Sequence, residues 1–287
     1  MSPELASRHF SALGSTCELL ALGVGQAALE RCEQRVRQEE VRFTRFVKES
    51  ELARLNAGDG RYVPVSPEMF AMLEAALWAY EESGGLVNAA ILPALRAAGY
   101  DRPFGQGLTQ PGSSEPMHVP GLPDVLILDG TTRSVALAPG AALDLGGIAK
   151  GALGDLLIDE LGDDAVCNLG GDVRVRGNGP EGDGWHIGLC DGSAVAVRDG
   201  AVCTSGTTRR RWGQSMHHLI DPKTGMPVRT DLEEVSVITD FALRGEVYAK
   251  CAMLLGASAG LAFLESRGVR HAVVPVGKGD GLLPAAV

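Results

Sequence analysis

Apolar and polar positions along the chain follow two different periods, which predicts a protein built from both helices and strands. Residues 26–46 carry apolar side chains at roughly helical spacing among many charges, which predicts a long charged helix. A second helix is predicted over residues 66–83, between a Ser-Pro start and a Ser-Gly-Gly stop. Its apolar stripe, expected to face the core, consists of Phe70, Leu73, Leu77 and Tyr80.

Short apolar segments bounded by Gly, Asp or Pro predict strands in the middle of the chain. These segments are residues 125–128, 134–138, 166–168, 173–176 and 185–189. Helices at 244–255 and 257–266 and a strand at 271–276 are expected near the end. The irregular mixture of helix and strand favours an α+β fold. Residues 104–123, rich in glycine and proline, are expected to form a flexible loop with little capacity to pack.

Length and composition indicate a folded, globular protein. Of 287 residues, 45% are hydrophobic and 22% charged, so we expect one domain over residues 1–287. The net charge of −10 disfavours binding to nucleic acid, which needs basic surfaces. We see no signal peptide and no run near the ~18 apolar residues of a membrane span, so we expect a cytoplasmic protein without membrane insertion. Six cysteines are scattered without C-x-x-C spacing, and most of them are expected to be reduced core residues.

A glycine-rich segment, L-D-L-G-G-I-A-K-G at residues 143–151, carries the first candidate chemistry. It predicts a strand that ends at Asp144, a turn at two glycines and a helix that opens near Ile148. Such a helix start presents backbone N–H groups and a positive dipole end, which suit a phosphate. Lys150 lies in that first turn, where a cation disfavours the helix, so a nearby anion would explain it. A tight strand-to-helix connection with a solvated lysine is the alternative.

Two further segments follow this one. N-L-G-G-D-V-R-V-R-G at residues 168–177 is typical of a turn between strands, although its glycines could also let backbone approach a ligand. T-S-G-T-T-R-R-R-W at 204–212 precedes H-H-L-I-D-P-K-T-G-M-P-V at 217–228. His217 and His218 would point to opposite faces of a strand, so that one can face a site while the other packs. A histidine near a phosphoryl group can act as a base or stabilise charge; incidental histidines are the alternative.

In this order, these segments resemble the FAD:protein FMN transferase family, also called the ApbE family. Other parts of the chain are similar to motifs of the same family, namely A-L-G-S-T at 12–16, F-T-R-F at 43–46, S-E-L-A-R-L-N at 50–56 and S-G-G-L-V-N-A-A at 83–90. The resemblance therefore extends across most of the chain. It implies a mixed α/β core of the T-fold-like type, with two closely packed subdomains and a flavin cleft between them.

The resemblance also implies an activity and a set of residues. Family members use Mg²⁺ to transfer the FMN part of FAD to a threonine hydroxyl of an acceptor protein, releasing AMP. His218 would be the acid/base or phosphate-stabilising residue, and Lys150 would act on the phosphates. The implied FAD-binding residues are Leu13, Leu86, Val87, Asn88, Asp144, Lys150, Thr204, Ser205, Gly206, His218 and Ile220.

The implied metal site is where this sequence departs from the family. Its A-D-A-x-A-T motif, which supplies Asp and Thr ligands, is replaced here by Gly245-Glu246-Val247-Tyr248-Ala249-Lys250. Glu246 can still offer oxygens, whereas a charged Lys250 has no lone pair to offer. Either Mg²⁺ binds through Glu246 and the carbonyl of Gly147, or the Lys250 ammonium takes part of the cation's place. Asn88 and Ala90, which stand where the family has Asp and Thr, weaken the site further.

Two other functions remain open beside FMN transfer. A protein of the same fold with weakened catalysis would be an FAD carrier or sensor, which the residues at positions 88, 90 and 250 favour. An FAD pyrophosphatase would use water in place of the threonine and release FMN and AMP without any acceptor.

Overall fold

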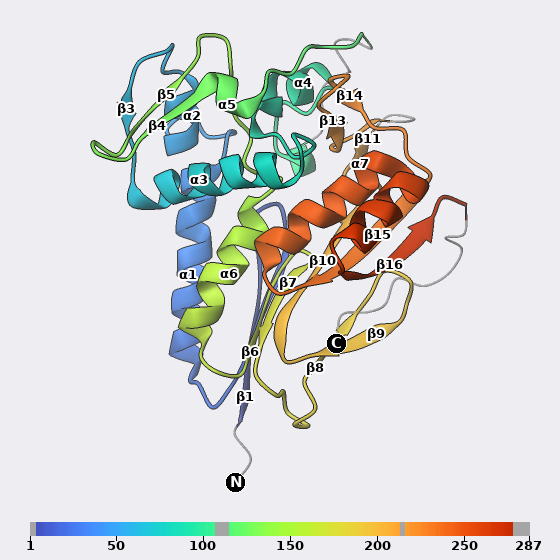
Figure 1. Cartoon of the computed structure of the whole chain (residues 1–287). Coiled ribbons are helices and arrows are strands. Elements are labelled where there is room, and N and C mark those ends of the chain that lie inside the picture. Colours follow the sequence, from blue (N-terminus) through green and yellow to red (C-terminus); the bar gives the residue numbers. More distant parts are fainter. Residues whose placement is uncertain (1–3, 107–114, 213–215, 278–287) are drawn as a thin grey trace. The chain divides into compact units, whose positions relative to one another are not determined.

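The computed structural model describes residues 4–106, 115–212 and 216–277 (Figure 1). The chain divides into two compact units, each assembled from segments that are distant in sequence. The first unit comprises Met1–Arg37, Lys150–Thr208 and Arg229–Val287, and the second comprises Gln38–Ala149 and Arg209–Val228. The glycine-rich segment at 143–151 therefore contributes residues to both units. A flavin cleft between subdomains stays a prediction.

A seven-stranded sheet forms the first unit, in the order β1-β2-β6-β7-β10-β15-β16, with all neighbouring strands antiparallel. Its strands are β1 (Leu5–Ala12), β2 (Ser15–Leu22), β6 (Ala165–Leu169), β7 (Asp172–Arg176), β10 (Asp199–Gly206), β15 (Leu232–Thr239) and β16 (Arg270–Pro275). A separate hairpin pairs β8 (Trp185–Gly188) with β9 (Ala194–Val197). Val175, Trp185 and Val202 belong to the apolar core that these strands bury.

Helices cover this sheet (Figure 1). α1 (Gln26–Phe43) begins in the first unit, while α6 (Ala149–Leu161) and α7 (Ala242–Ser266) lie almost wholly within it. α7 packs on β10 and β15. The start of α7 is capped by Asp155 of α6, whose carboxylate accepts hydrogen bonds from the N–H groups of Ala242 (2.8 Å) and Leu243 (2.9 Å). The predicted break before residue 257 is confirmed, because Gly256 leaves the helical conformation with φ of 76°.

α7 also revises the expectation about membrane spans. By length and composition alone it is the one helix among the described residues that is long and apolar enough to cross a membrane. In the structure its first half lies on the sheet with Val247, Cys251 and Met253 buried, and it carries the buried carboxylate of Glu246. Those contacts are typical of the core helix of a sheet-based unit.

The second unit is built mainly from short elements. Its helices are α2 (Glu51–Asn56), α3 (Pro67–Glu82), α4 (Leu92–Ala97), α5 (Leu122–Val125) and the 3₁₀ turns η1 (Ala89–Ile91) and η2 (Phe104–Gln106). A small sheet has the order β3-β5-β4, formed by β3 (Val63–Pro64), β4 (Leu126–Asp129) and β5 (Ser134–Leu137). Two short hairpins pair β11 (Arg211–Trp212) with β12 (Met216–His217) and β13 (Ile220–Asp221) with β14 (Met226–Pro227).

Helix α3 begins as predicted but buries a different face. The Ser66 hydroxyl accepts a hydrogen bond from the Met69 N–H (3.1 Å) and so caps the helix. The fully buried positions are Met69, Met72, Leu73, Ala76 and Ala79. Of the expected stripe, Leu73 is buried as predicted, whereas Phe70, Leu77 and Tyr80 are only partly buried. Small or flexible side chains at positions 69, 72, 76 and 79 complete the buried face instead.

The expected loop at 104–123 is only partly described, because residues 107–114 lie outside the described residues. Its second half is better packed than expected. Met117 donates its N–H to the Thr224 carbonyl (2.9 Å), and Met117 and Val119 pack against the core around Leu95 and Tyr100. The prediction of little packing was wrong there, because the isolated apolar residues between the prolines pack against this hydrophobic cluster.

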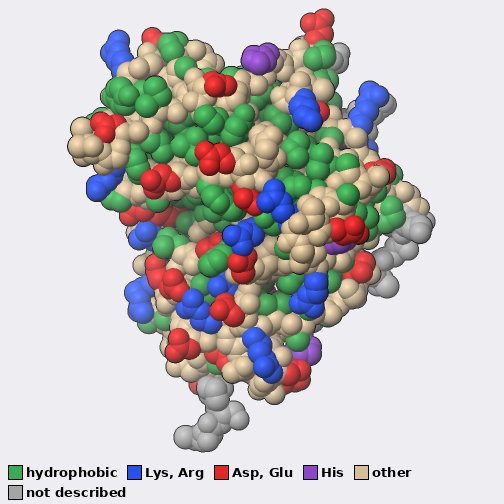
Figure 2. Space-filling view, viewed as in Figure 1, with side chains coloured by type: hydrophobic (Ala, Val, Ile, Leu, Met, Phe, Trp, Pro, Cys, Tyr) green, Lys and Arg blue, Asp and Glu red, His purple; other side chains and the backbone are tan. Residues whose placement is uncertain are grey.

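Charged side chains are mixed over the face seen in Figure 2, where acidic and basic groups alternate without a broad area of one sign. Candidate chemistry on this protein therefore depends on specific local contacts.

Candidate functional site

The turn that leads into α6 is held in place by Asp144. Its carboxylate accepts the Gly146 N–H (2.9 Å) and pairs with the buried guanidinium of Arg45. Arg45 also donates to the Tyr100 carbonyl (2.8 Å) and lies over the rings of Phe46 (4.2 Å) and Tyr100 (4.7 Å). Asp144 is thus fixed within the second unit by a charge-assisted hydrogen bond and by the stacking of its partner.

Backbone donors of this turn are largely engaged by the protein itself. Ile148 and Ala149 both donate to the Leu145 carbonyl, at 3.1 and 3.0 Å. The Gly151 N–H, one of the free donors expected at the helix start, donates to the carboxylate of Glu246 (2.8 Å). The expectation of a set of open N–H groups awaiting a phosphate was therefore wrong for these residues, because a side chain from α7 already satisfies the helix terminus.

Lys150 meets its anion within the first unit. Its ammonium forms an ion pair with Asp172, the last residue of the N-x-G-G-D string and the first of β7. This pairing explains why a lysine is tolerated in the first turn of α6, where a cation alone would oppose the helix dipole. A protein carboxylate therefore supplies the anion that the sequence predicted beside Lys150.

The glycine pair before Asp172 has a packing reason. Gly170 and Gly171 adopt φ of 70° and 95°, and a Cβ on Gly170 would come within 2.5 Å of the Ser15 side chain. The Gly171 carbonyl accepts the N–H of Thr204, the first residue of the T-S-G string on β10 (3.0 Å). Two of the sequence motifs are thus neighbours in the first unit.

Thr204, Ser205 and Gly206 form the end of β10. The Thr204 hydroxyl shares a hydrogen bond with that of Ser236 on β15 (2.8 Å), and Ser205 is buried. A role in flavin binding for these three residues stays a prediction.

Glu246 and Lys250 pair with each other on α7. Lys250 Nζ lies 2.9 Å from Glu246 Oε1, with the two residues one helical turn apart. The other carboxylate oxygen, Oε2, is the acceptor for Gly151. Both oxygens of the one acidic residue expected to bind a metal are therefore occupied by donors.

The two ion pairs influence one another. Burial alone would raise the pKa of Glu246, but the ammonium groups of Lys250 and Lys150 outweigh it and lower that pKa. For Asp172 burial dominates and raises the pKa, although Lys150 and Lys250 oppose it. Lys150, Asp172, Glu246 and Lys250 thus form one buried set of two cations and two anions, called below the four-charge cluster.

This arrangement does not fit a magnesium site. Among residues 4–106, 115–212 and 216–277 there is no group of three or more His, Cys, Asp or Glu side chains that could hold a metal ion. Mg²⁺ needs several oxygen ligands around it, and Glu246 offers none that is not already hydrogen-bonded. Its neighbour Lys250 is a cation that would repel the metal. Gly147 belongs to the other unit, and its role as a ligand stays a prediction.

The two adjacent histidines differ in their surroundings. His217 is buried, with Nε2 2.9 Å from the Val228 carbonyl and Nδ1 accepting the Leu219 N–H (3.3 Å). Burial lowers its pKa, so it is neutral at pH 7. His218 lies in the link between β12 and β13, followed by buried Leu219 and Ile220. His217 therefore packs, and a chemical role for His218 stays a prediction.

Two of the remaining predicted flavin contacts have informative backbone or side-chain geometry. Leu13 adopts φ of 55° in the two-residue turn between β1 and β2, a conformation that costs a leucine ~1 kcal/mol and is often retained at functional positions. Asn88 is buried and caps η1, accepting the Ala90 N–H (2.9 Å) and donating to the Pro120 carbonyl (2.9 Å). Leu86 and Val87 precede it, and Val87 is buried.

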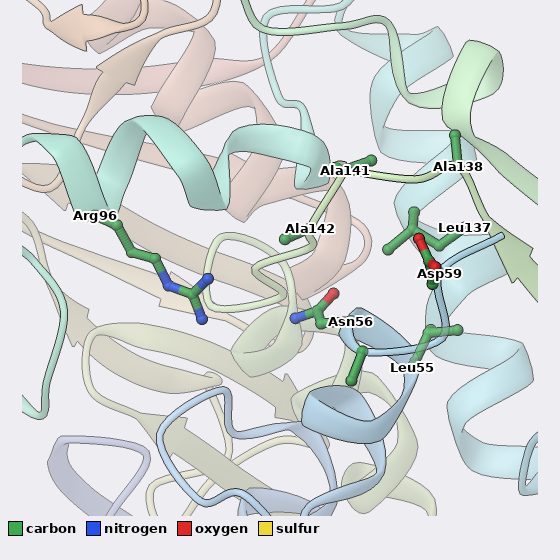
Figure 3. Close-up of a pocket in the computed structure, with 10 residues that line it drawn as sticks. Leu55, Asn56, Asp59, Arg96, Leu137, Ala138, Ala141 and Ala142 are labelled. Atoms are coloured by element: carbon green, nitrogen blue, oxygen red, sulfur yellow. The ribbon is translucent and has the colours of Figure 1, made fainter.

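A cavity of about 230 Å³ in the second unit is not lined by any of the predicted ligand residues (Figure 3). It lies between α2, α4 and the segment after β5, with Asn56 and Arg96 among its lining residues. The Asn56 amide donates to the Leu143 carbonyl (3.0 Å) and accepts its N–H (2.7 Å). This part of the unit therefore fixes the segment that leads into the glycine-rich turn.

Sequence reasoning missed Arg45, Asp155 and Asp172 as partners. Asp172 and Arg45 both lie within motifs that resemble those of the family. The lysine in the first turn of a helix indicated that an anion lies nearby, and Asp172 is that anion. No local pattern indicated Asp155, since the helix that it caps begins 87 residues later in the chain.

Comparison with known proteins decides the family. The model of the ApbE family matches residues 13–274. The chain belongs to the ApbE family. An ApbE-family relative from Klebsiella pneumoniae (strain 342), named FAD:protein FMN transferase, is 31% identical over 274 residues, covering 89% of this chain and 84% of the relative. Another of that name, from Treponema pallidum (strain Nichols), is 32% identical over 264 residues, covering 80% and 72%.

Solved ApbE structures share the fold. The ApbE protein of Thermotoga maritima superposes with a TM-score of 0.82 at 21% identity, covering 96% of this chain and 95% of that chain. The flavinyl transferase ApbE of Pseudomonas stutzeri gives 0.79 at 23% identity, covering 97% and 93%. The α+β fold of the ApbE type that the resemblance implied is confirmed.

Proposed function

We propose that this chain transfers FMN from FAD to a threonine hydroxyl of an acceptor protein and releases AMP. The observation that supports this most is the relationship, over 89% of the chain, to a protein named FAD:protein FMN transferase. A shared fold does not by itself fix an activity, which depends on the site residues. The local geometry around those residues is therefore the second support.

The proposed reaction needs positive charge at a diphosphate and a group that takes the proton of the threonine hydroxyl. The hydroxyl oxygen attacks the phosphorus of the FMN half, the diphosphate bond breaks, and AMP leaves with the bridging oxygen. Lys150 and Lys250 supply positive charge in the first unit. His218 is the proposed base, since its neighbour His217 is held by backbone groups on both ring nitrogens.

Covalent flavin on an acceptor tests the proposal. A protein that naturally carries threonine-linked FMN, prepared without its flavin, would be incubated with FAD and the purified chain. We expect a mass increase of one FMN on the acceptor, flavin fluorescence in a denaturing gel, and one AMP per FMN. The acceptor with its threonine replaced by valine is the control for the position. The Klebsiella pneumoniae relative serves as the positive control, and failure of this chain where that relative succeeds would reject transferase activity.

One observation favours a second candidate, an FAD carrier or sensor with weakened catalysis. The Lys250 ammonium is hydrogen-bonded to the Glu246 carboxylate, which is the group that would bind the cation implied by the family resemblance. The same assay separates the possibilities. FAD binding without transfer and without AMP indicates a carrier, while FMN and AMP formed without acceptor indicate a pyrophosphatase.

A further inference from the structure

The acidic and basic side chains of the four-charge cluster differ in their exposure to solvent. The side chains of its carboxylates are almost fully buried, with exposures of 3% for Asp172 and 1% for Glu246, whereas those of Lys150 and Lys250 are 15% and 14% exposed. The anions therefore lie inside and the part of the cluster that solvent reaches is cationic. An approaching ion meets ammonium groups first.

We propose that this cluster is a metal-free receptor for the diphosphate of the ligand, in which Lys250 supplies the positive charge that a divalent ion would otherwise bring. The proposal rests on the proposed function only for the identity of the ligand as FAD. Its chemical content is narrower: a diphosphate binds to the lysines directly, and Glu246 binds no divalent cation.

The unequal exposure of the charges supports this assignment. The cluster is neutral as a whole, but its ammonium groups are more exposed than its carboxylates, so an approaching divalent cation would meet charges of its own sign first. A cation bound to Glu246 Oε1 would compete with the Lys250 ammonium that already bonds to that oxygen, and the other oxygen, Oε2, already accepts the Gly151 N–H. A diphosphate does not compete for these oxygens, because it binds ammonium donors, of which Lys250 has three and uses one for the carboxylate.

Buried carboxylates behind the lysines also explain how two ammonium groups can be kept close together and charged. Each lysine has its own carboxylate, and each carboxylate also interacts with the second lysine. The anions thus position the lysines, and the lysines face the ligand. Removing the charge of Lys250 should weaken phosphate binding and, at the same time, leave Glu246 open to a metal.

Binding measurements on the full chain test both consequences. Titration calorimetry would give Kd for FAD, ADP, inorganic pyrophosphate and riboflavin, in EDTA and in millimolar magnesium. For the wild type we expect the Kd of FAD to agree within about twofold between the two conditions. In Lys250→Met, FAD, ADP and pyrophosphate should bind about tenfold or more weakly, because a charge-assisted contact is lost, while riboflavin, which has no phosphate, is unaffected.

Electron paramagnetic resonance of Mn²⁺ tests the metal side without reference to activity. The wild type should show no bound Mn²⁺ that depends on Glu246, Lys250→Met should gain one bound ion, and Lys250→Met/Glu246→Gln should lose it again. Arg244→Met is the matched control, because it removes an exposed ion pair between Arg244 of the same helix and Asp240 just before it, and should change neither measurement.

Tenfold weaker FAD or pyrophosphate binding by the wild type in EDTA would overturn the proposal, as would Glu246-dependent Mn²⁺ binding. Both are measured on the wild type, so they stand even where Lys250→Met does not fold. Transfer activity that strictly requires a divalent ion, together with such binding, rejects this proposal and leaves the proposed function intact. Metal-independent pyrophosphate binding that depends on Lys250, without any transfer, supports this proposal and rejects the proposed function.

Discussion

The carboxylate of Glu246 on α7 accepts a hydrogen bond of 2.8 Å from the backbone N–H of Gly151 in the first turn of α6. This contact joins the glycine-rich motif to a helix that begins about ninety residues later, and it continues through Glu246 to Lys250. The stability of the first unit should therefore depend on the charges of this pair.

Lys250→Met is expected to lower the free energy of unfolding by ~3 kcal/mol, because it leaves the carboxylate of Glu246 buried without its cation. The double variant Glu246→Gln/Lys250→Met should recover most of that loss, since it leaves no unpaired charge at position 246. Urea denaturation at neutral pH measures both. Arg244→Met, which breaks the exposed pair of Arg244 on α7 with Asp240 just before that helix, should cost less than ~0.5 kcal/mol. Equal losses in Lys250→Met and the double variant would contradict this account.

Gly151→Ala should separate α6 from α7. A Cβ at this position would lie 2.6 Å from the Ala242 carbonyl oxygen and 2.8 Å from Leu243 Cα, which are backbone atoms that cannot rotate away. We expect a loss of ~1–3 kcal/mol in the free energy of unfolding and a weaker contact with Glu246. Gly188→Ala, with no atom within 4 Å of the added methyl, is the control and should be nearly neutral. A stable Gly151→Ala with unchanged thermal midpoint would refute the tight packing.

Acidification should destabilise the protein through His217. Burial lowers its folded pKa below the 6.5 of an unfolded histidine, so below that pH the unfolded chain binds the proton more readily. The stabilisation is complete above pH 6.5 and is lost as the pH falls from there through the folded pKa. His217→Gln should show a smaller decrease in thermal midpoint than the wild type between about pH 7.5 and pH 5. Exposed His186→Gln is the control, and an unchanged slope in His217→Gln would be the contrary result.

How far the sequence predicted the fold depended on how local each signal was. The helices α1 and α3 and the break at Gly256 were predicted because periodicity and caps are written in neighbouring residues. Strands β1, β2, β10 and β15 were not predicted, although they form much of the central sheet. Their stability comes from pairing across the sheet, between segments far apart in the chain, and no local pattern reports such pairing.

The candidate site shows the same limit. Lys150 and Glu246 could be singled out by residue type and position, whereas the pairing of Lys150 with Asp172 required the turn at Gly170 to bring β7 beside α6. The sequence correctly raised the i,i+4 pair of Glu246 and Lys250, because that contact is local. Long-range partners of charged groups became known only from the structure.

Arg45→Lys should loosen the glycine-rich turn in the second unit. A lysine lacks the planar guanidinium that lies over the rings of Phe46 and Tyr100 while it also bonds to Asp144 and the Tyr100 carbonyl. We expect a loss of ~1–2 kcal/mol in unfolding free energy, measured by chemical denaturation. The exposed pair of Arg102 with Asp101 provides the matched control, since Arg102→Lys should have no measurable effect. Similar stability for both variants would argue against a structural role of the stacking.

His218→Gln should separate binding from chemistry if the proposed transfer holds. Loss of the base is expected to lower kcat by ~100-fold or more, with a Kd for FAD close to that of the wild type. Transfer to the acceptor would be followed by fluorescence, and FAD binding by calorimetry. The exposed His186→Gln variant should keep full kcat. A His218→Gln protein with normal kcat would assign the proton to another group.

The pairing of opposite charges among Lys150, Asp172, Glu246 and Lys250 also restricts which amino-acid substitutions this protein can accept in evolution. Substitution of one of the four residues by a neutral residue leaves its partner charged, buried and unpaired. Substitutions that persist are therefore expected to change a lysine and its paired acid together. Aligned sequences of near relatives should therefore show positions 246 and 250 varying together. Under the metal-free binding proposed above, the arrival of a lysine at position 250 would mark the branch of the family tree on which the ammonium took the place of a divalent ion.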